Sequence, residues 1–97
     1  MIRPIPLRLL GHKIEIDGQE IKRVRVEPNN KIFKDIYGES IESKYLIFID
    51  SVNSVGDFKL LENGKRVKFK DIEMTIIDIQ ELIEYGDQIH HLEVVCN

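Results

Sequence analysis

The chain of 97 residues contains one cysteine, no tryptophan and no long apolar run. Cys96 has no second cysteine with which to form an internal disulfide, so stability must come from packing, and we expect this thiol to be buried or at a fraying end. The longest apolar run, Tyr45 to Ile49, is far shorter than the roughly 20 residues that span a bilayer. The first residues also lack the apolar segment of a signal peptide. We therefore expect a protein that is made in a cytoplasm and enters no membrane.

Residues that carry catalytic chemistry are equally scarce. His90 and His91 are neighbours in an expected strand, so their side chains should point to opposite faces and could not share one metal ion. His12 is isolated, and no acidic pair, phosphate loop or nucleophile signature occurs. The polar stretch from Asp50 to Ser54 is typical of a loop whose short side chains bond their own backbone. We expect no enzyme, no cofactor and no metal site.

What the sequence does contain is the pattern of β-strands. From Ile21 to Val26, cations and β-branched residues alternate, and this stretch follows an Asp17-Gly18 turn signal, so it predicts a half-buried strand. With Ile14 to Ile16 it predicts a hairpin, because Asp-Gly favours the positive φ angles of a tight turn. Tyr45 to Ile49 is continuously apolar, which predicts a strand covered on both faces at the centre of the core.

Further strands are expected in the second half of the chain. Arg66 to Phe69 leads through a tight Lys70-Asp71 connection into a strand from Glu73 to about Leu82, and Ile89 to Val95 forms the closing strand. About six short strands without an amphipathic helix predict an all-β fold in a single domain. A small, SH3-like, partly open β-barrel would protect the sheet edges, with an oligonucleotide-binding type of barrel as the alternative.

The segment from Lys31 to Lys44 has the weakest pattern. It mixes isolated apolar residues with six charges and Gly38, which permits either a short helix or an extended hairpin. Because the apolar residues do not keep a helical spacing, we expect a hairpin with its tip near Tyr37-Gly38. This segment should project from the domain as a long loop.

Charge is distributed unevenly along the chain. Residues 1–34 carry eight Lys or Arg against four Asp or Glu, whereas the remaining residues carry six against thirteen. Asp71 to Asn97 contains seven acids and neither Lys nor Arg. If the two regions lie on different faces, copies could associate head to tail, which is the geometry that closes rings. A solvated surface of mixed charge is the other interpretation.

Nucleic-acid binding is a class that small barrels often serve. Arg23 and Arg25 should lie on one strand face, which would suit local contact with phosphates. An isoelectric point of about 5.6 and an aromatic content of 7% are unfavourable for holding phosphate backbones or stacking bases. A small nucleic-acid-binding barrel stays open as an alternative.

Four segments occur in an order and spacing that resemble a known family: Arg3 to Leu10, Val24 to Pro28, Ile47 to Ser54 and His90 to Val94. The chain is similar, over essentially its full length, to the tailed-phage minor capsid protein family. Members are encoded among the head-to-tail joining proteins of phages and prophages of Gram-positive bacteria. The similarity is weakest over 31–44 and 80–88.

The resemblance implies a structural virion component of the head-tail connector, a head-completion protein or stopper. Such a protein forms a ring below the portal and its adaptor, closes the channel after DNA packaging and docks the tail. Its partners would be the portal or adaptor ring, tail proteins and further copies of itself, while DNA passes without specific binding. It would act at the head-tail junction of the virion after assembly in the host cytoplasm. A tail-completion or other connector subunit on the same barrel is the alternative within this class.

Two sets of residues follow from this resemblance as site candidates. The projecting loop would occlude the channel through Phe33, Lys34, Asp35, Ile36, Tyr37, Gly38 and Glu39. Partners would be contacted by an extended N-terminal arm over residues 1–10, which two prolines stiffen, and by the first cationic strand. The contact candidates are Arg3, Pro4, Ile5, Pro6, Arg8, Arg23 and Arg25.

Overall fold

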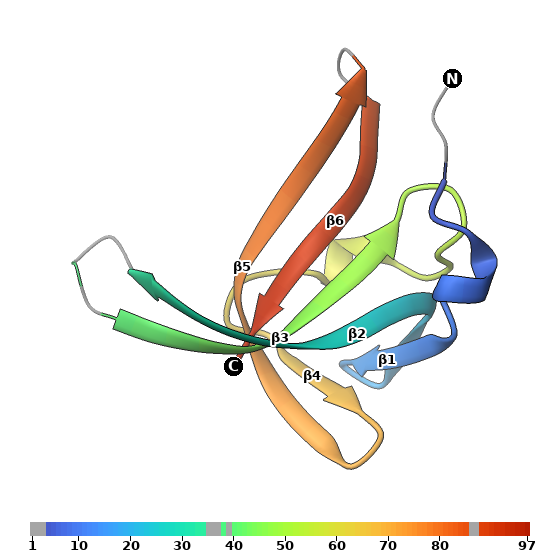
Figure 1. The fold of residues 1–97 in the computed structure, drawn as a ribbon. Helices are drawn as coiled ribbons and strands as arrows, with labels where there is room; N and C mark the ends of the chain where they lie inside the picture. The colour runs from blue at the N-terminus through green and yellow to red at the C-terminus, as the bar shows by residue number, and fades with distance from the viewer. Residues whose placement is uncertain (1–3, 35–37, 39, 86–87) are drawn as a thin grey trace.

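The fold is a small all-β barrel, as the strand pattern predicts. A computed structural model of the chain describes residues 4–34, 38, 40–85 and 88–97 (Figure 1). Its strands are β1 (His12–Ile16), β2 (Gln19–Lys34), β3 (Ser40–Asp50), β4 (Arg66–Phe69), β5 (Ile72–Tyr85) and β6 (Gln88–Cys96). Two short 3₁₀ turns, η1 (Leu7–Leu9) and η2 (Phe58–Leu60), complete the regular structure of the described residues.

The strands form two antiparallel meanders that close on each other. The ring order is β1-β2-β3-β6-β5-β4, with β3 paired to β6 and β4 returning to β1. The barrel is therefore closed, whereas we expected a partly open one. The pairing that closes the ring is short, because β1 and β4 share the single register pair Glu15–Lys68. This order also places β6 opposite β1, three steps away in either direction around the ring.

Two-residue turns fix the register of both predicted hairpins. Asp17 and Gly18 have φ angles of 52° and 78°, so both central residues of the β1–β2 turn adopt the positive φ that the sequence predicted. The Lys70-Asp71 connection between β4 and β5 is equally tight, with φ of 54° at Lys70. Local turn chemistry therefore sets which residues face the barrel interior.

A β-bulge interrupts the alternation predicted for β2. Ile21 and Val24 are both buried, and the two residues between them, Lys22 and Arg23, are both exposed. The register against β1 passes from Lys22–Lys13 to Val24–His12, so Arg23 has no opposite residue on β1. Arg23 adopts a φ of 58°, which an L side chain rarely takes. The prediction of strict alternation between cations and β-branched residues was wrong here. Lys22 and Arg23 are consecutive cations, and the strand needs one extra residue if the apolar residues before and after them are both to face the interior.

The barrel interior is filled by apolar side chains from all six strands. The core comprises Ile14, Ile16, Ile21, Val24, Val26, Ile47, Ile49, Leu61, Val67, Phe69, Met74, Ile76, Val94 and Cys96. The predicted central strand is confirmed in this position, since Ile47 and Ile49 are buried, although Leu46 and Phe48 on its outer face are only partly covered. Burial raises the pKa of the Cys96 thiol to about 12, so this cysteine is an unreactive core residue.

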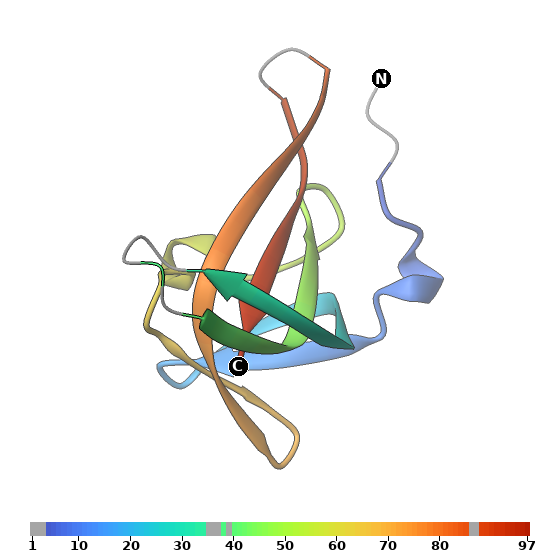
Figure 2. The ribbon, with the colours of Figure 1, turned by 60° about the vertical axis from the view of Figure 1, so that its left-hand side comes forward.

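The β2–β3 hairpin extends well beyond the barrel, as expected for the segment after Lys31. Its ladder continues through Phe33–Ile41 to Lys34–Ser40, and no third strand pairs with this outer part within the described residues. In Figure 1 it stands away from the other strands, and Figure 2 shows it crossing in front of them after the turn of view. We call residues 31–42 the β2–β3 arm. Gly38 is exposed with φ of 79°, whereas Asp35, Ile36, Tyr37 and Glu39 lie outside the described residues.

Candidate functional site

The buried carboxylate of Asp50 fastens the N-terminal segment to the barrel. Asp50 ends β3 and is completely buried. Its Oδ1 accepts a hydrogen bond of 2.9 Å from the backbone N–H of Ile5, and the side-chain amide of Asn53 donates to the Ile5 carbonyl at 2.9 Å. Both backbone groups of Ile5 are thus bound by one loop. We call this arrangement the Asp50 latch.

The same loop satisfies its own backbone, as the sequence predicted. Oδ2 of Asp50 accepts from the N–H groups of Val52 and Asn53 at 3.0 and 2.8 Å. The Ser54 hydroxyl accepts from the Asp50 N–H and donates to the carbonyl of Arg23, at 2.8 and 2.5 Å. The bond to Arg23 holds the bulge of β2 in place. The sequence indicated the local bonds but gave no sign of the contacts to Ile5 and Arg23.

Two of the predicted contact residues meet in an apolar hollow beside the latch. Ile5 and Leu9 lie near Phe48, Arg25, Glu27 and His91 around a volume of about 400 Å³. The Arg25 guanidinium forms an ion pair with Glu27. The N-terminal segment thus partly covers the outer face of β3.

The other contact candidates are more dispersed. Pro4, Pro6 and Arg8 are exposed, and Arg3 lies outside the described residues. The arm is extended only as far as Pro6, because Leu7–Leu9 forms a 3₁₀ turn, closed by the Leu10 N–H bonding to the Leu7 carbonyl. Arg23 and Arg25 do not share one surface, since the bulge turns Arg23 towards a different groove.

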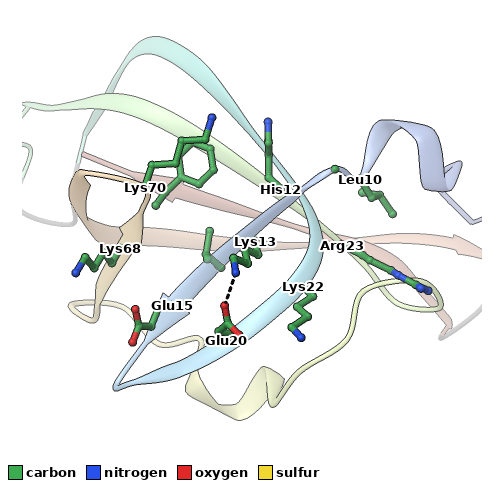
Figure 3. A pocket seen from close by; sticks show the side chains of 12 residues that line it. Leu10, His12, Lys13, Glu15, Glu20, Lys22, Arg23, Lys68 and Lys70 are labelled. Atoms are coloured by element: carbon green, nitrogen blue, oxygen red, sulfur yellow. Dashed lines mark ion pairs between the residues drawn. The ribbon is translucent and has the colours of Figure 1, made fainter.

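A basic groove of about 550 Å³ runs over β1 between β2 and β4. Five Lys or Arg side chains and two Glu side chains line it: Lys13, Lys22, Arg23, Lys68, Lys70, Glu15 and Glu20. Figure 3 shows Lys68 and Lys70 on one side, Lys22 and Arg23 on the other, and the Lys13–Glu20 ion pair of 2.9 Å between them. Within the described residues, Lys13 is the only one of these five cations that forms an ion pair. The groove therefore presents an excess of positive charge to solvent.

His12 lies in the wall of the basic groove and is held neutral. Its Nδ1 accepts a hydrogen bond of 3.0 Å from the Val26 N–H, so the ring proton resides on Nε2. The ring stacks edge-on against Phe69, with 5.0 Å between the ring centroids. Burial, with further contributions from Lys70 and Arg25, lowers the pKa of His12 below its ordinary value of 6.5. His12 acts here as a structural hydrogen-bond acceptor.

The side chains of His90 and His91 lie together, which corrects the prediction of opposite faces. Their Nδ1 atoms are 2.7 Å apart. The β5–β6 register passes from Ile83–Ile89 to Leu82–His91, so His90 has no opposite residue and the alternation is lost. Burial lowers the pKa of His91, although Glu93 and Asp50 oppose this effect. No group of three potential metal ligands occurs in the described part of the chain.

Sequence reasoning missed the basic groove because its cations come from three separate segments. Lys13, Lys22 and Lys68 become neighbours only when β4 returns to β1. The available signal was the pair of adjacent cations at Lys22-Arg23, which departs from strict alternation.

Comparisons with known proteins leave the family open. Neither a scan against family models nor a search among curated proteins finds a match to this chain. Over the described residues, no helix has both the length and the apolar character needed to cross a membrane.

Proposed function

We propose that this protein is a subunit of a phage head-tail connector, of the stopper type that closes the portal channel after DNA packaging and docks the tail. The observation that carries the proposal is the β2–β3 arm, a two-stranded ribbon that leaves a closed barrel and to which no third strand pairs in the described part of the chain. The resemblance described above supports the same class. In the assembled particle the protein would lie at the head-tail junction.

A free two-stranded ribbon is a reason to expect partners. Isolated hairpins are marginally stable in water, and their outer edges present unpaired backbone groups. In a ring, such arms can pack against neighbouring subunits or converge on the axis. Converging arms would occlude the channel through the candidates from Phe33 to Glu39.

The spatial distribution of charge also supports a ring. The basic groove lies over β1, whereas β5 and β6 contain acids and neither Lys nor Arg. β6, which carries Glu93, is opposite β1 in the barrel, and β5, which carries the other acids, is separated from β1 by β4. Surfaces of unlike charge on different strands suit head-to-tail association of copies. The isolated protein can still be a monomer that assembles only on its partner ring.

The N-terminal segment offers a contact to the adjoining rings. Pro4, Pro6 and Arg8 are exposed, while the Asp50 latch fixes Ile5 between them. A short segment that is anchored at one residue and exposed on both sides can dock without losing much conformational entropy.

The test uses tail-less phage heads that carry portal and adaptor, incubated with the purified protein and imaged by electron microscopy. We expect end-on rings at the one portal vertex and retention of packaged DNA. A variant in which Asn-Gly replaces residues 31–42 should still dock but should release DNA. Binding to completed tails instead of heads would favour the tail-completion alternative, and absence of binding to either would contradict the proposal.

A nucleic-acid-binding barrel is the second candidate, and the basic groove is the observation that favours it. A duplex bound there would lose affinity steeply as salt is raised, because each neutralised phosphate releases counterions. A connector subunit should retain little duplex at any physiological salt concentration. Fluorescence anisotropy with a labelled duplex, measured over a salt series, separates the two candidates.

A further inference from the structure

The ring of strands has an open seam between β1 and β4. These two strands share one register pair, Glu15–Lys68, whereas every residue of β1 pairs with β2 and all four residues of β4 pair with β5. On one side of the Glu15–Lys68 pair, the residues from Lys13 back to Leu10 and those from Phe69 to Lys70 line the basic groove. The groove therefore occupies the part of the seam in which β1 and β4 no longer pair.

The backbone of Lys13 is directed into this seam. Lys22, which is opposite Lys13 on β2, bonds Val55 through both its N–H and its C=O, at 2.7 and 2.9 Å. The Lys13–Lys22 pair is therefore of the kind that exchanges no hydrogen bonds, in which the backbone groups of both residues point away from each other. Those of Lys13 point towards β4, which has no register pair with Lys13 in the described part of the chain. β1 thus presents a donor and an acceptor to the groove, as an edge strand does.

Cations without an ion pair surround the same position. Lys22, Arg23, Lys68 and Lys70 line the groove, and none of them forms an ion pair with any described residue. Figure 3 shows Lys68 and Lys70 on the β4 side of the seam and Lys13 on the β1 side. A carboxylate placed beside Lys13 in the seam would therefore have lysines on both sides of it.

The floor of the groove is apolar. Leu10, Ile14 and Phe69 are buried and line it, and the ring of His12 packs edge-on against that of Phe69. An extended segment in the seam would direct every second side chain onto this floor and the others outward among the lysines. The partner that matches both surfaces is a strand in which apolar and acidic residues alternate.

Three features of the groove favour a polypeptide over a nucleic acid. Glu15 and Glu20 lie among the cations and would repel a phosphate backbone. The aromatic side chain of the groove, Phe69, is only 9% exposed and so offers no face on which a base could stack. The N–H and C=O of Lys13 are matched by the paired acceptor and donor of another peptide backbone, which a nucleic acid does not have.

We propose that the seam between β1 and β4 accepts an extended segment of a partner protein in which acidic and apolar residues alternate. The segment lies antiparallel to β1, as β2 and β4 do, and exchanges hydrogen bonds with the N–H and C=O of Lys13. Opposite residues of neighbouring strands share a face, so the acidic side chain opposite Lys13 lies outward among the lysines. This inference goes beyond the proposed connector function, because it names the chemistry of a partner and requires no ring of copies.

Hydrogen exchange at single amides tests the predicted hydrogen bond. The probe is a short synthetic peptide of alternating glutamate and valine, added at neutral pH to the ¹⁵N-labelled full chain. At saturating peptide the Lys13 N–H should exchange at least about tenfold more slowly, because it gains an acceptor. The Lys22 N–H already bonds Val55 and is the internal control, which should keep its exchange rate. Absence of peptide binding, or an unchanged rate at Lys13 with the peptide bound, overturns the inference.

Methylation of the peptide backbone identifies the edge that pairs. In the antiparallel arrangement, the glutamate N–H groups of the peptide face Lys13, and the valine N–H groups face away from β1. Methylated glutamate nitrogens should weaken binding by about tenfold or more, because the hydrogen bonds to β1 are lost. The peptide with methylated valine nitrogens is the matched control and should bind clearly better. Methylated glutamates that weaken binding no more than methylated valines contradict the pairing with β1.

Neutralisation of the lysines tests the contribution of charge. Lys68→Gln/Lys70→Gln should weaken peptide binding about fivefold at low salt, since two exposed charge pairs are lost. The control Lys44→Gln/Lys59→Gln removes the same net charge from exposed lysines outside the groove and should change the affinity little. Circular dichroism verifies that both variants fold. Equal affinities of the two variants count against the groove as the binding site.

The outcomes separate this inference from the proposed function. Docking of the protein on phage heads without any binding of the peptide would refute the inference and leave the connector function intact. Peptide binding with protection of Lys13 but without docking would do the reverse. A labelled DNA duplex that displaces the peptide and loses its own affinity in Lys68→Gln/Lys70→Gln would assign the groove to nucleic acid and overturn the inference.

Discussion

At the scale of single residues, buried polar groups hold together parts of the chain that are distant in sequence. Asp50 and Ser54 bond backbone groups of Ile5 and Arg23, and His12 accepts from the N–H of Val26. Among the described residues, no buried side-chain nitrogen or oxygen lacks a hydrogen-bond partner. Removal of one partner should therefore cost more than the bond itself, because the other group is left buried and unsatisfied.

Replacement of Asp50 by alanine should be strongly destabilising. The substitution leaves the N–H groups of Ile5, Val52 and Asn53 without their acceptor, and we expect a loss of about 3 kcal/mol of unfolding free energy. Asp57→Ala is the matched control, because Asp57 also accepts from a backbone N–H, that of Lys59, but is exposed, and it should lose no more than about 1 kcal/mol. Urea unfolding measures both. Equal losses in the two variants would contradict the importance of the latch.

The two histidines with lowered pKa values should make the fold sensitive to mild acid. Burial lowers the pKa of His12, helped by Lys70 and Arg25, and lowers that of His91 against the effects of Glu93 and Asp50. The unfolded chain then binds more protons than the folded one, so stability is present above the unfolded pKa and falls as the pH is lowered through it.

We therefore expect the unfolding free energy to be lower at about pH 5.5 than at about pH 7.5. Urea unfolding at the two pH values measures the difference, and the His12→Gln variant should reduce it, because one of the two groups no longer titrates. Stability that is unchanged or greater at the lower pH would contradict the assignment of neutral histidines.

At the scale of elements, the bulge of β2 decides where the cations point. Arg23 occupies the extra position with a φ of 58°, and Ser54 holds its carbonyl. Without the bulge, the residues after it would turn to the opposite face, and Val24 and Val26 would leave the core. Packing of the residues on both sides of Arg23 thus keeps its backbone in this strained conformation.

Arg23→Gly should be neutral or stabilising, by up to about 1 kcal/mol, because glycine adopts positive φ without steric cost. The neighbouring exposed residue gives the control: Lys22→Gly should destabilise by about 1 kcal/mol, since the backbone of Lys22 lies outside the positive-φ region. Chemical denaturation of both variants measures the difference. A clear loss of stability in Arg23→Gly would mean that the arginine side chain itself stabilises the barrel.

At the scale of the whole molecule, the core and the projecting arm are separate parts. The core residues lie on the closed ring of strands and, in the case of Leu61, directly after η2, whereas the outer part of the β2–β3 ladder has no third strand paired to it among the described residues. Ser43 and Asn29 hydrogen bond to each other at the base of the arm, so the barrel is completed before the arm begins.

Replacement of residues 31–42 by Asn-Gly should consequently change the unfolding free energy by no more than about 1 kcal/mol, because a two-stranded excursion adds little to a barrel. Thermal and urea unfolding of the shortened protein measure this. A loss of several kcal/mol of unfolding free energy would show that the arm packs on the barrel. It would contradict the proposed role of the arm as an element that is free to contact neighbouring subunits.

The strand pattern and the turns are local properties, and for that reason they could be predicted. Asp17-Gly18 favours positive φ in any context, the apolar residues of β1 and β5 repeat with the period of a strand, and Tyr45 to Ile49 of β3 is continuously apolar. The β2–β3 hairpin was predicted for the same reason, since its apolar spacing favoured a hairpin over a short helix.

The closure of the ring, the Asp50 latch and the basic groove depend on contacts between distant segments. Ile5 and Asp50 are far apart in the sequence, and Lys22 and Lys68 become neighbours only when β4 closes on β1. Bulges at Arg23 and His90 shift side chains by one position, an effect that no period of two can represent. The amino-acid order thus sets local conformation and the imbalance of charge, while packing across the barrel sets which charges meet.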